Sequence, residues 1–259
     1  MKFDVIIGNP PYQGTSGTQT GQTIWDKIVE VSLEHVKPDG LLTFIHPGRW
    51  RQADDKLGYM YRNYQLVYLS IHSVKDGIKT FGACTNYDVY MIHKVPPQRN
   101  SRIRFMDGSE GMYHVNRLPF IPNTMINFWI KAFNSSGPYL EVHQSGTHNP
   151  GSRHMSPVET PEHVFPIVHK MGEELEYYYS TKPHKHQSEP KIVFRDQGKS
   201  WAQINKSGCG SHTYYVLGDS QELLDFFLSK RYTEIAQSVT FGHRQIPYKP
   251  LCYLPLSLI

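Results

Sequence analysis

The residues best suited to chemistry form one short run near the start of the chain, Asn9-Pro10-Pro11-Tyr12. Consecutive prolines lack backbone donors and fix two φ angles, so this run is a rigid loop whose carbonyl groups stay free to accept hydrogen bonds. An Asn side-chain oxygen and a proline carbonyl held side by side can accept both hydrogens of a planar amino group, while a Tyr ring stacks on the heterocycle that carries it. The pattern favours a site for the amino group of a nucleobase.

A strand is expected to position this loop. Residues Phe3 to Ile7 are apolar apart from Asp4, which is typical of a strand buried on both faces of a parallel sheet. Gly8 ends the strand directly before Asn9. A strand that ends in a proline-rich turn without any catalytic role is the alternative interpretation.

The run IIGNPPY resembles the catalytic motif of amino-group methyltransferases that use S-adenosylmethionine, and specifically that of adenine-N6 DNA methylases of the restriction-modification type. Enzymes that methylate ribosomal RNA guanines or the glutamine amide of release factors have the same motif. The resemblance makes Asn9, Pro10, Pro11 and Tyr12 the catalytic residues. It implies that Asn9 and the Pro10 carbonyl accept the amino hydrogens of a flipped adenine, that Tyr12 stacks on its ring, and that neither a metal nor a covalent enzyme intermediate is needed.

The segments after the loop extend this resemblance. The order of a helix followed by PDGLLTFIHPGRW resembles the segment that follows the motif in these methylases. Apolar periodicity predicts helices at Ile24–Val36 and Tyr59–Tyr64 and strands at Leu41–Ile45, Leu66–Ile71 and Tyr87–His93. We therefore predict an α/β fold in which residues 1–97 form a partial Rossmann-like methyltransferase sheet, the catalytic half of a methyltransferase domain.

Two tyrosines of the last predicted strand, Tyr87 and Tyr90, are candidates for a further ring that packs against the flipped base. The segment before them, KTFGACTNY, resembles the family's approach to the strand that carries such a ring. Aromatic residues also occur in strands for packing reasons alone, and an ordinary structural role is the alternative.

The composition changes at Pro96 and Pro97, where prolines precede polar and charged residues, and we place a domain boundary there. Residues 98–259 are expected to form an irregular α+β target-recognition region. Its predicted elements are strands at Ile192–Phe194 and Thr213–Leu217, a helix around Val164–Tyr178, and a helix at Gln221–Lys230 capped by Asp219 or Ser220. The last helix and the following HRQIPYKPLCYLPL resemble the end of restriction-type adenine methylases, which favours the DNA enzymes.

Basic and aromatic residues alternate in this second region, a mixture that suits phosphate contacts and base stacking on double-stranded DNA. The candidate DNA-binding residues are Arg153, Lys182, Lys185, Lys191, Arg195, Lys199 and Lys206. A merely solvated basic surface would look similar. The net charge of +4 over 259 residues permits a nucleic-acid partner without proving one.

Several protein classes are disfavoured by composition. The three cysteines are widely spaced and form no CxxC pair, so neither a disulfide framework nor a zinc site is indicated. No apolar run approaches the roughly 18 residues of a membrane span. The start MKFDVII lacks the cleavage region of a signal peptide, and we expect a soluble cytoplasmic protein.

In the methylases that this chain resembles, a glycine-rich cofactor loop precedes the NPPY motif, and here only eight residues precede Asn9. No later segment matches an FxGxG-like turn. One long edge of the FDVII strand should therefore have unpaired backbone groups that need a cover. We expect a second protein subunit to complete the S-adenosylmethionine pocket of a split adenine-N6 DNA methyltransferase. The rival hypothesis is a methylase-derived protein that binds DNA or partners without transferring a methyl group.

Overall fold

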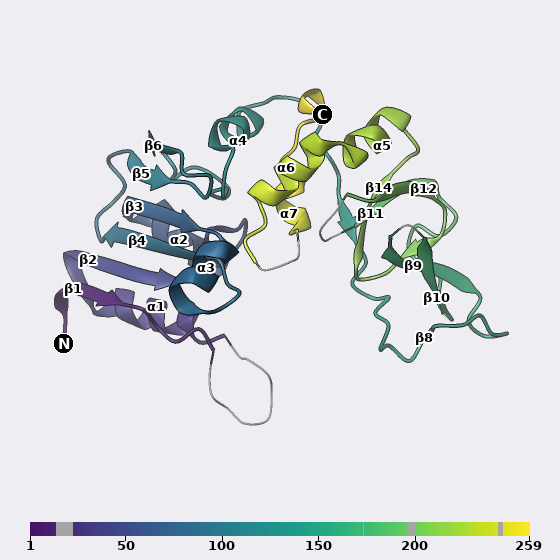
Figure 1. Ribbon diagram of the computed structural model, residues 1–259, viewed down its shortest axis with the longest axis horizontal. Coiled ribbons are helices and arrows are strands. Elements are labelled where there is room, and N and C mark those ends of the chain that lie inside the picture. The colour runs from purple at the N-terminus through teal and green to yellow at the C-terminus, as the bar shows by residue number, and fades with distance from the viewer. Residues whose placement is uncertain (14–22, 173, 196–199, 243–245) are drawn as a thin grey trace. The chain divides into compact units, whose positions relative to one another are not determined.

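The computed structural model describes residues 1–13, 23–172, 174–195, 200–242 and 246–259 (Figure 1). The chain divides into two compact units. The first unit comprises Met1–Ile130 and Val239–His243, and the second comprises Lys131–Ser238 and Arg244–Ile259. The chain thus stays in the first unit well past the boundary predicted at Pro97.

A six-stranded mixed sheet is the framework of the first unit, with the strand order β1-β2-β4-β3-β5-β6. Its strands are β1 (Phe3–Gly8), β2 (Val36–His46), β3 (Gln65–His72), β4 (Tyr87–His93), β5 (Ser101–Arg104) and β6 (Glu110–Tyr113). β1 runs parallel to β2 and β3 runs parallel to β5, whereas β4 is antiparallel to both β2 and β3. The predicted strands of this unit are confirmed. The pairing of β5 with β3 explains why the unit continues beyond Pro97.

The helical segments of this part of the chain are α1 (Trp25–His35), η1 (Gly48–Arg51), η2 (Lys56–Gly58), α2 (Tyr59–Asn63), α3 (Val74–Phe81) and α4 (Ile126–Phe133). Helix α1 buries Trp25, Val29 and Leu33, whereas Val31, which was expected on the same apolar face, is exposed. It ends where β2 begins. Lys94 Nζ donates to the carbonyl oxygens of Leu33 and Val36 at 2.6 and 2.8 Å, which satisfies acceptors that a helix end leaves without partners.

Strand β1 is far more exposed than its sequence suggests. Phe3, Val5 and Ile7 are 42%, 49% and 77% exposed, although Ile6 packs against the core. Within the part of the chain that the structure describes, β1 has one neighbouring strand, β2, and lies at the outer edge of the sheet (Figure 1). The expectation of a strand buried on both faces is therefore wrong for these residues. The expectation of an open, apolar edge is confirmed.

The second unit contains two four-stranded sheets with the orders β13-β9-β10-β8 and β12-β11-β14-β7. The strands are β7 (His143–Gln144), β8 (Met155–Ser156), β9 (Phe165–Met171), β10 (Leu175–Ser180), β11 (Lys191–Arg195), β12 (Ala202–Asn205), β13 (Gly208–Cys209) and β14 (Thr213–Leu217). The helical segments are α5 (Gln221–Leu228), α6 (Lys230–Ser238), α7 (Tyr248–Leu251) and η3 (Leu256–Leu258). This is the irregular α+β arrangement expected for the region.

Three of the elements predicted for this unit are present, and one predicted helix is absent from its place. The strands β11 and β14 and the helix α5 are confirmed, and the cap of α5 is Ser220, whose Oγ accepts from the backbone N–H of Leu223 at 3.3 Å. The predicted helix around Val164–Tyr178 is wrong, because β9 and β10 pair there as an antiparallel hairpin. β-branched and aromatic residues and an internal proline favour strands over a helix in this segment. None of the helices among the described residues is long and apolar enough to cross a membrane.

Candidate active site

The NPPY loop leaves the sheet at the edge where several strands end. The register pairs Gly8 of β1 with Phe44 of β2, and it pairs His46, at the end of β2, with Asp88 at the start of β4. His72, the last residue of β3, is paired with Tyr87. Ligands of open α/β sheets bind at such carboxyl-terminal strand ends.

The four residues of the loop differ in their exposure. Asn9 and Pro11 are exposed, Pro10 is buried and Tyr12 is half-buried. Within the described ranges, no residue donates a hydrogen bond to the Asn9 side chain or to the Pro10 carbonyl oxygen. A Cβ at Gly8 would come within 2.9 Å of the Phe44 ring, so glycine allows the strand to end close to β2. Neither acceptor is therefore occupied by a donor from the part of the chain that the structure describes.

Tyr12 directs its hydroxyl group into the protein. The hydroxyl oxygen is buried, and no described residue is its hydrogen-bond partner. Burial raises the pKa of Tyr12 to about 12, and the charges of Tyr87 and Asp88 act in the same direction. The hydroxyl therefore stays protonated, and the ring is the part of Tyr12 that can serve a ligand.

The two other predicted stacking residues are buried. Tyr90 is fully buried and packs its ring against Trp50 at a centroid distance of 4.7 Å, so the prediction that it stacks on a base is corrected: this ring belongs to the core. Tyr87 is nearly buried and stacks on His72 at 4.4 Å with parallel ring planes. A base could use Tyr87 only if a neighbouring ring moved away.

Phe81 is an aromatic residue that our sequence reasoning passed over. It is the last residue of α3, is 38% exposed, and meets the Tyr87 ring edge-on at 4.9 Å. Gly77 lets α3 lie against the turn before β4, because a Cβ there would come within 1.8 Å of the Thr85 carbonyl oxygen. The signal in the sequence was an aromatic residue directly before Gly82, which ends the helix with a φ of +67°.

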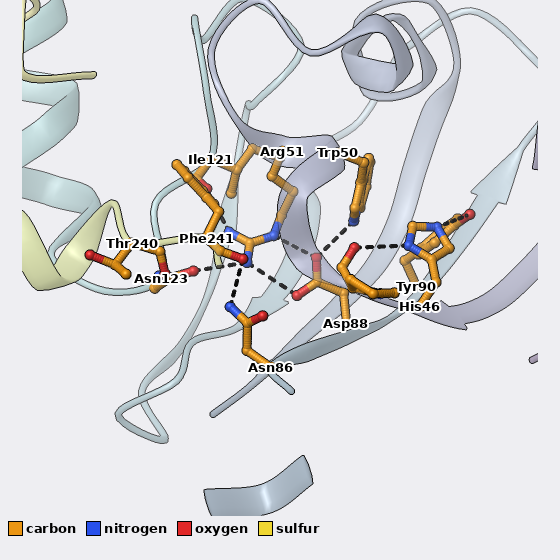
Figure 2. A network of polar contacts seen from close by, with 11 residues as sticks. His46, Trp50, Arg51, Asn86, Asp88, Tyr90, Ile121, Asn123, Thr240 and Phe241 are labelled. Atoms are coloured by element: carbon orange, nitrogen blue, oxygen red, sulfur yellow. Dashed lines mark hydrogen bonds and ion pairs between the residues drawn. The ribbon is translucent and has the colours of Figure 1, made fainter. Parts of the chain in front are cut away.

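A buried ion pair lies at the same end of the sheet (Figure 2). Arg51 donates to Asp88 Oδ2 through Nε at 2.6 Å and to Asp88 Oδ1 through Nη2 at 3.1 Å. Trp50 Nε1 donates to the same Oδ2 at 2.7 Å. Since both charged side chains are buried, these short, paired hydrogen bonds are needed to offset the cost of removing the charges from water.

His46 is held as a neutral imidazole beside this pair. Its Nδ1 donates to the Pro47 carbonyl oxygen at 3.0 Å, so its Nε2 is the acceptor for the Tyr90 hydroxyl at 3.0 Å. Trp25 stacks on the imidazole at 4.3 Å. Burial lowers the pKa of His46 to about 4, so the ring is uncharged near neutral pH.

The basic residues predicted to bind DNA divide by exposure. Arg153, Lys182, Lys185 and Lys206 are exposed, Arg195 is half-buried, and Lys199 lies outside the described residues. The prediction for Lys191 is corrected, because its side chain is buried and its Nζ donates to the carbonyl oxygens of Glu189 and Ser207 at 2.7 and 3.0 Å. Burial lowers the pKa of Lys191, and its amino group is bound to backbone carbonyls inside the second unit. The described residues include no cluster of His, Cys, Asp or Glu that could hold a metal ion.

The first part of the chain is similar to a known protein family. Residues 1–79 match the family described as Eco57I restriction-modification methylase. No curated protein matches the sequence. The segment that carries the NPPY loop is therefore similar to the methylase domain of that family.

Solved structures resemble this chain in fold at low sequence identity. The type IIL restriction-modification enzyme MmeI in complex with DNA has a TM-score of 0.54 and 8% identity, over 96% of this chain and 46% of that one. The ATP-dependent type ISP enzyme LlaBIII bound to DNA gives 0.46 and 9%, over 94% and 28%. The M protein of the type I restriction enzyme EcoKI gives 0.32 and 14%, over 40% and 25%. The chain spans less than half the length of each of these structures.

Proposed function

We propose that this chain is the catalytic and target-recognition part of a DNA methyltransferase that methylates the N6 amino group of adenine. The observation that carries the proposal is the NPPY loop, whose Asn9 side chain is exposed and whose acceptors have no partner among the described residues. This loop lies at the ligand-binding end of an α/β sheet, in a segment that matches a restriction-modification methylase family.

The loop acts on the amino group by accepting its hydrogens. Asn9 Oδ1 and the Pro10 carbonyl oxygen each accept a hydrogen bond from one N–H of the adenine amino group. These two hydrogen bonds direct the nitrogen lone pair away from the ring plane. S-adenosylmethionine supplies the methyl group when it is bound. The two acceptors hold the nucleophile in line and stabilise the positive charge that develops on nitrogen.

Aromatic rings hold the base after it is flipped out of the duplex. Tyr12 provides one stacking face, since its ring is half-exposed while its hydroxyl is buried. We assign the second ring to Phe81 rather than to Tyr90, because Phe81 is exposed next to Tyr87 whereas Tyr90 is fully buried. Stacking of this kind contributes about 1–3 kcal/mol per base.

The described residues fit only one side of the cofactor. The acceptors for the substrate amine are present. The turn that follows β1, which begins at Gly8-Asn9, is not the glycine-rich turn that would hold the methionine part of S-adenosylmethionine. The open edge of β1 supports a cofactor-binding half that pairs with it and covers Val5 and Ile7. This half would come from polypeptide outside residues 1–259, and a second subunit is one such source.

Target DNA is assigned to the second unit. Its exposed basic side chains, Arg153, Lys182, Lys185 and Lys206, suit contacts with the phosphates of double-stranded DNA, and half-buried Arg195 can add another. Lys199 remains a candidate by sequence alone. Such contacts fix the position of the duplex without reading its sequence.

The test is methyl transfer with the cofactor-binding half supplied. The chain is mixed with that half, labelled S-adenosylmethionine and duplex DNA, and the products are digested to nucleosides. We expect label in N6-methyl-2′-deoxyadenosine only. Label in a methylated deoxycytidine would overturn the substrate assignment. Absence of any label, together with intact DNA binding, would favour a methylase-derived binding protein, which the open β1 edge also permits.

A further inference from the structure

A short stretch of the first unit comes from far along the chain. Val239–His243 return to this unit directly after helix α6 of the second unit. The side chain of Phe241 in this stretch is almost fully buried, with the Phe120 ring edge-on at 6.2 Å and the Arg51 guanidinium 5.2 Å from its centroid. These contacts bury Phe241 in the first unit, so the backbone carbonyl groups around it need hydrogen-bond partners.

Two side-chain amides hold the backbone of this stretch. Asn86 Nδ2 donates to the Phe241 carbonyl oxygen and Asn123 Nδ2 donates to the Thr240 carbonyl oxygen, each at 2.8 Å (Figure 2). Asn86 and Asn123 are both buried. Hydrogen bonds to consecutive carbonyl groups fix the position of the backbone along its own direction, whatever side chains it carries. We call Asn86, Asn123 and Arg51 the clamp.

The clamp is connected to the candidate active site through Arg51. Arg51 Nη2 donates to Asn123 Oδ1 at 2.9 Å, and Arg51 Nη1 donates to the Ile121 carbonyl oxygen at 2.6 Å. The remaining donors of Arg51 hold Asp88. Asp88 lies at the start of β4 and is close enough to raise the pKa of the Tyr12 hydroxyl. A continuous set of hydrogen bonds therefore leads from Thr240 to the edge of the sheet where Tyr12 lies.

We infer that Asn86, Asn123 and Arg51 are positioning residues for methyl transfer. They fix the stretch that follows α6 against the start of β4, and thereby hold the end of the sheet at which the NPPY loop lies. This inference rests on the proposed function for its catalytic readout. A buried ionic network contributes less to stability than equally well-packed apolar residues, which agrees with a role in fixing one arrangement.

The experiment uses Asn123→Asp. A carboxylate at this position still accepts from Arg51 Nη2 but cannot donate to the Thr240 carbonyl, so the clamp opens while the Arg51 contact stays. Asn100→Asp, on an exposed residue of the same unit, is the matched control for the added charge. Asn86→Ala opens the second contact and should act in the same direction.

With the reconstituted enzyme, we expect Asn123→Asp to lower kcat on duplex DNA roughly tenfold, with the DNA Kd within about twofold of the parent, because small misplacements are costly for an aligned reaction. Both are measured at a temperature where the protein is fully folded. An unchanged kcat would overturn the inference, and so would a loss of DNA binding that accounts for the whole effect.

Hydrogen exchange gives a readout that needs no activity. Asn123→Asp, but not Asn100→Asp, should speed amide exchange in residues 239–242 and also at Tyr87 and Asp88. Faster exchange confined to residues 239–242 would mean a local tether without a link to the site, and would overturn the inference. If the parent enzyme transfers no methyl group, the proposed function fails. The exchange pattern still decides whether a change at Asn123 affects Tyr87 and Asp88.

Discussion

The two units solve the problem of buried polar groups in different ways. In the first unit, the Arg51–Asp88 pair is buried with every group of the pair hydrogen-bonded, and the buried histidine His46 has a partner for each ring nitrogen. In the second unit, five histidines form a chain of ring contacts at centroid distances of 5.4 to 6.2 Å. They are His143, His148, His154, His184 and His186.

This histidine chain is less completely satisfied than the ion pair. The Nε2 atoms of His143 and His186 are buried without a hydrogen-bond partner among the described residues, although Glu141 and Glu189 carboxylates lie 3.5 and 3.1 Å from atoms of these rings. Removing one partner of a buried ion pair leaves an unpaired buried charge, whereas buried neutral imidazoles are disturbed when acid protonates them. The first unit should therefore be sensitive to mutation of its pair, and the second to acid.

The largest effect is expected from breaking the ion pair. Arg51→Leu leaves the Asp88 carboxylate buried with only the Trp50 donor, and should lower the free energy of unfolding by about 3–5 kcal/mol. Urea unfolding followed by tryptophan fluorescence measures the loss. The double variant Arg51→Leu, Asp88→Leu removes both charges and should recover part of the stability. A single variant as stable as the parent would show that the pair does not distinguish the two units.

The next effect is on chemistry at an exposed residue. Asn9→Ala should lower methyl transfer about 10²-fold or more, because one aimed acceptor is lost, while folding and DNA binding stay nearly intact. Tyr12→Ala should be comparably damaging, whereas Tyr12→Phe should be mild, since the ring stacks and the buried hydroxyl has no partner among the described residues. The measurement is single-turnover methylation. Unchanged turnover in Asn9→Ala would remove this residue from the mechanism.

Regular, locally encoded features of the first unit could be predicted from sequence. Apolar runs gave the strands from Phe3 to His93, and helix α1 followed from its apolar face. The partners of Arg51 could not be predicted, because Asp88 and Asn123 are distant in sequence and only the folded sheet brings them together. Asn9 and Pro10 could be chosen as candidate acceptors from the motif alone, whereas the burial of Tyr90 depends on tertiary packing that a strand pattern does not reveal.

The second unit was harder to predict because its elements are short and its sheets are built from distant segments. The parallel pairing of β13 with β9 joins Gly208 to Ile167, and no local pattern indicates it. The hairpin of β9 and β10 was mistaken for a helix, since short apolar runs fit either period. Lysine commonly binds phosphate, so the sequence alone favoured a DNA contact for Lys191. Only its hydrogen bonds to the carbonyl groups of Glu189 and Ser207 reveal that its side chain lies inside the protein.

Acid should destabilise the second unit first. Burial lowers the pKa of His184 to about 4 and lowers those of His143, His148 and His169, while His46 and His72 are the described histidines of the first unit whose pKa values are lowered. A depressed histidine pKa means that the unfolded state takes up protons first. The stability from the neutral rings is therefore complete above about pH 6.5 and is lost as the pH falls toward 4.

Hydrogen exchange at pH 7 and pH 5 measures this difference unit by unit. We expect a larger rise in exchange for β11 and β14 than for β2 and β4. His184→Gln should reduce the acid effect, because His184 Nδ1 accepts from the backbone N–H of His186 at 3.1 Å only while it is unprotonated. His114→Gln, at an exposed position of the first unit, is the control. Equal acid sensitivity in both units would contradict the comparison.

The smallest expected effect is on DNA affinity, and it distinguishes an exposed lysine from the buried Lys191. Lys185→Gln removes an exposed charge and should weaken binding to all DNA sequences alike, lowering the slope of log Kd against log salt by about one. Lys191→Gln should leave that slope unchanged and lower stability instead, because the Lys191 ammonium group is bound to two backbone carbonyls inside the protein. Fluorescence anisotropy at several salt concentrations gives the slopes, and urea unfolding gives the stabilities. A reduced slope in Lys191→Gln would mean that this lysine leaves its carbonyl partners to reach the phosphates, and the division between an internal and a DNA-facing lysine would not hold.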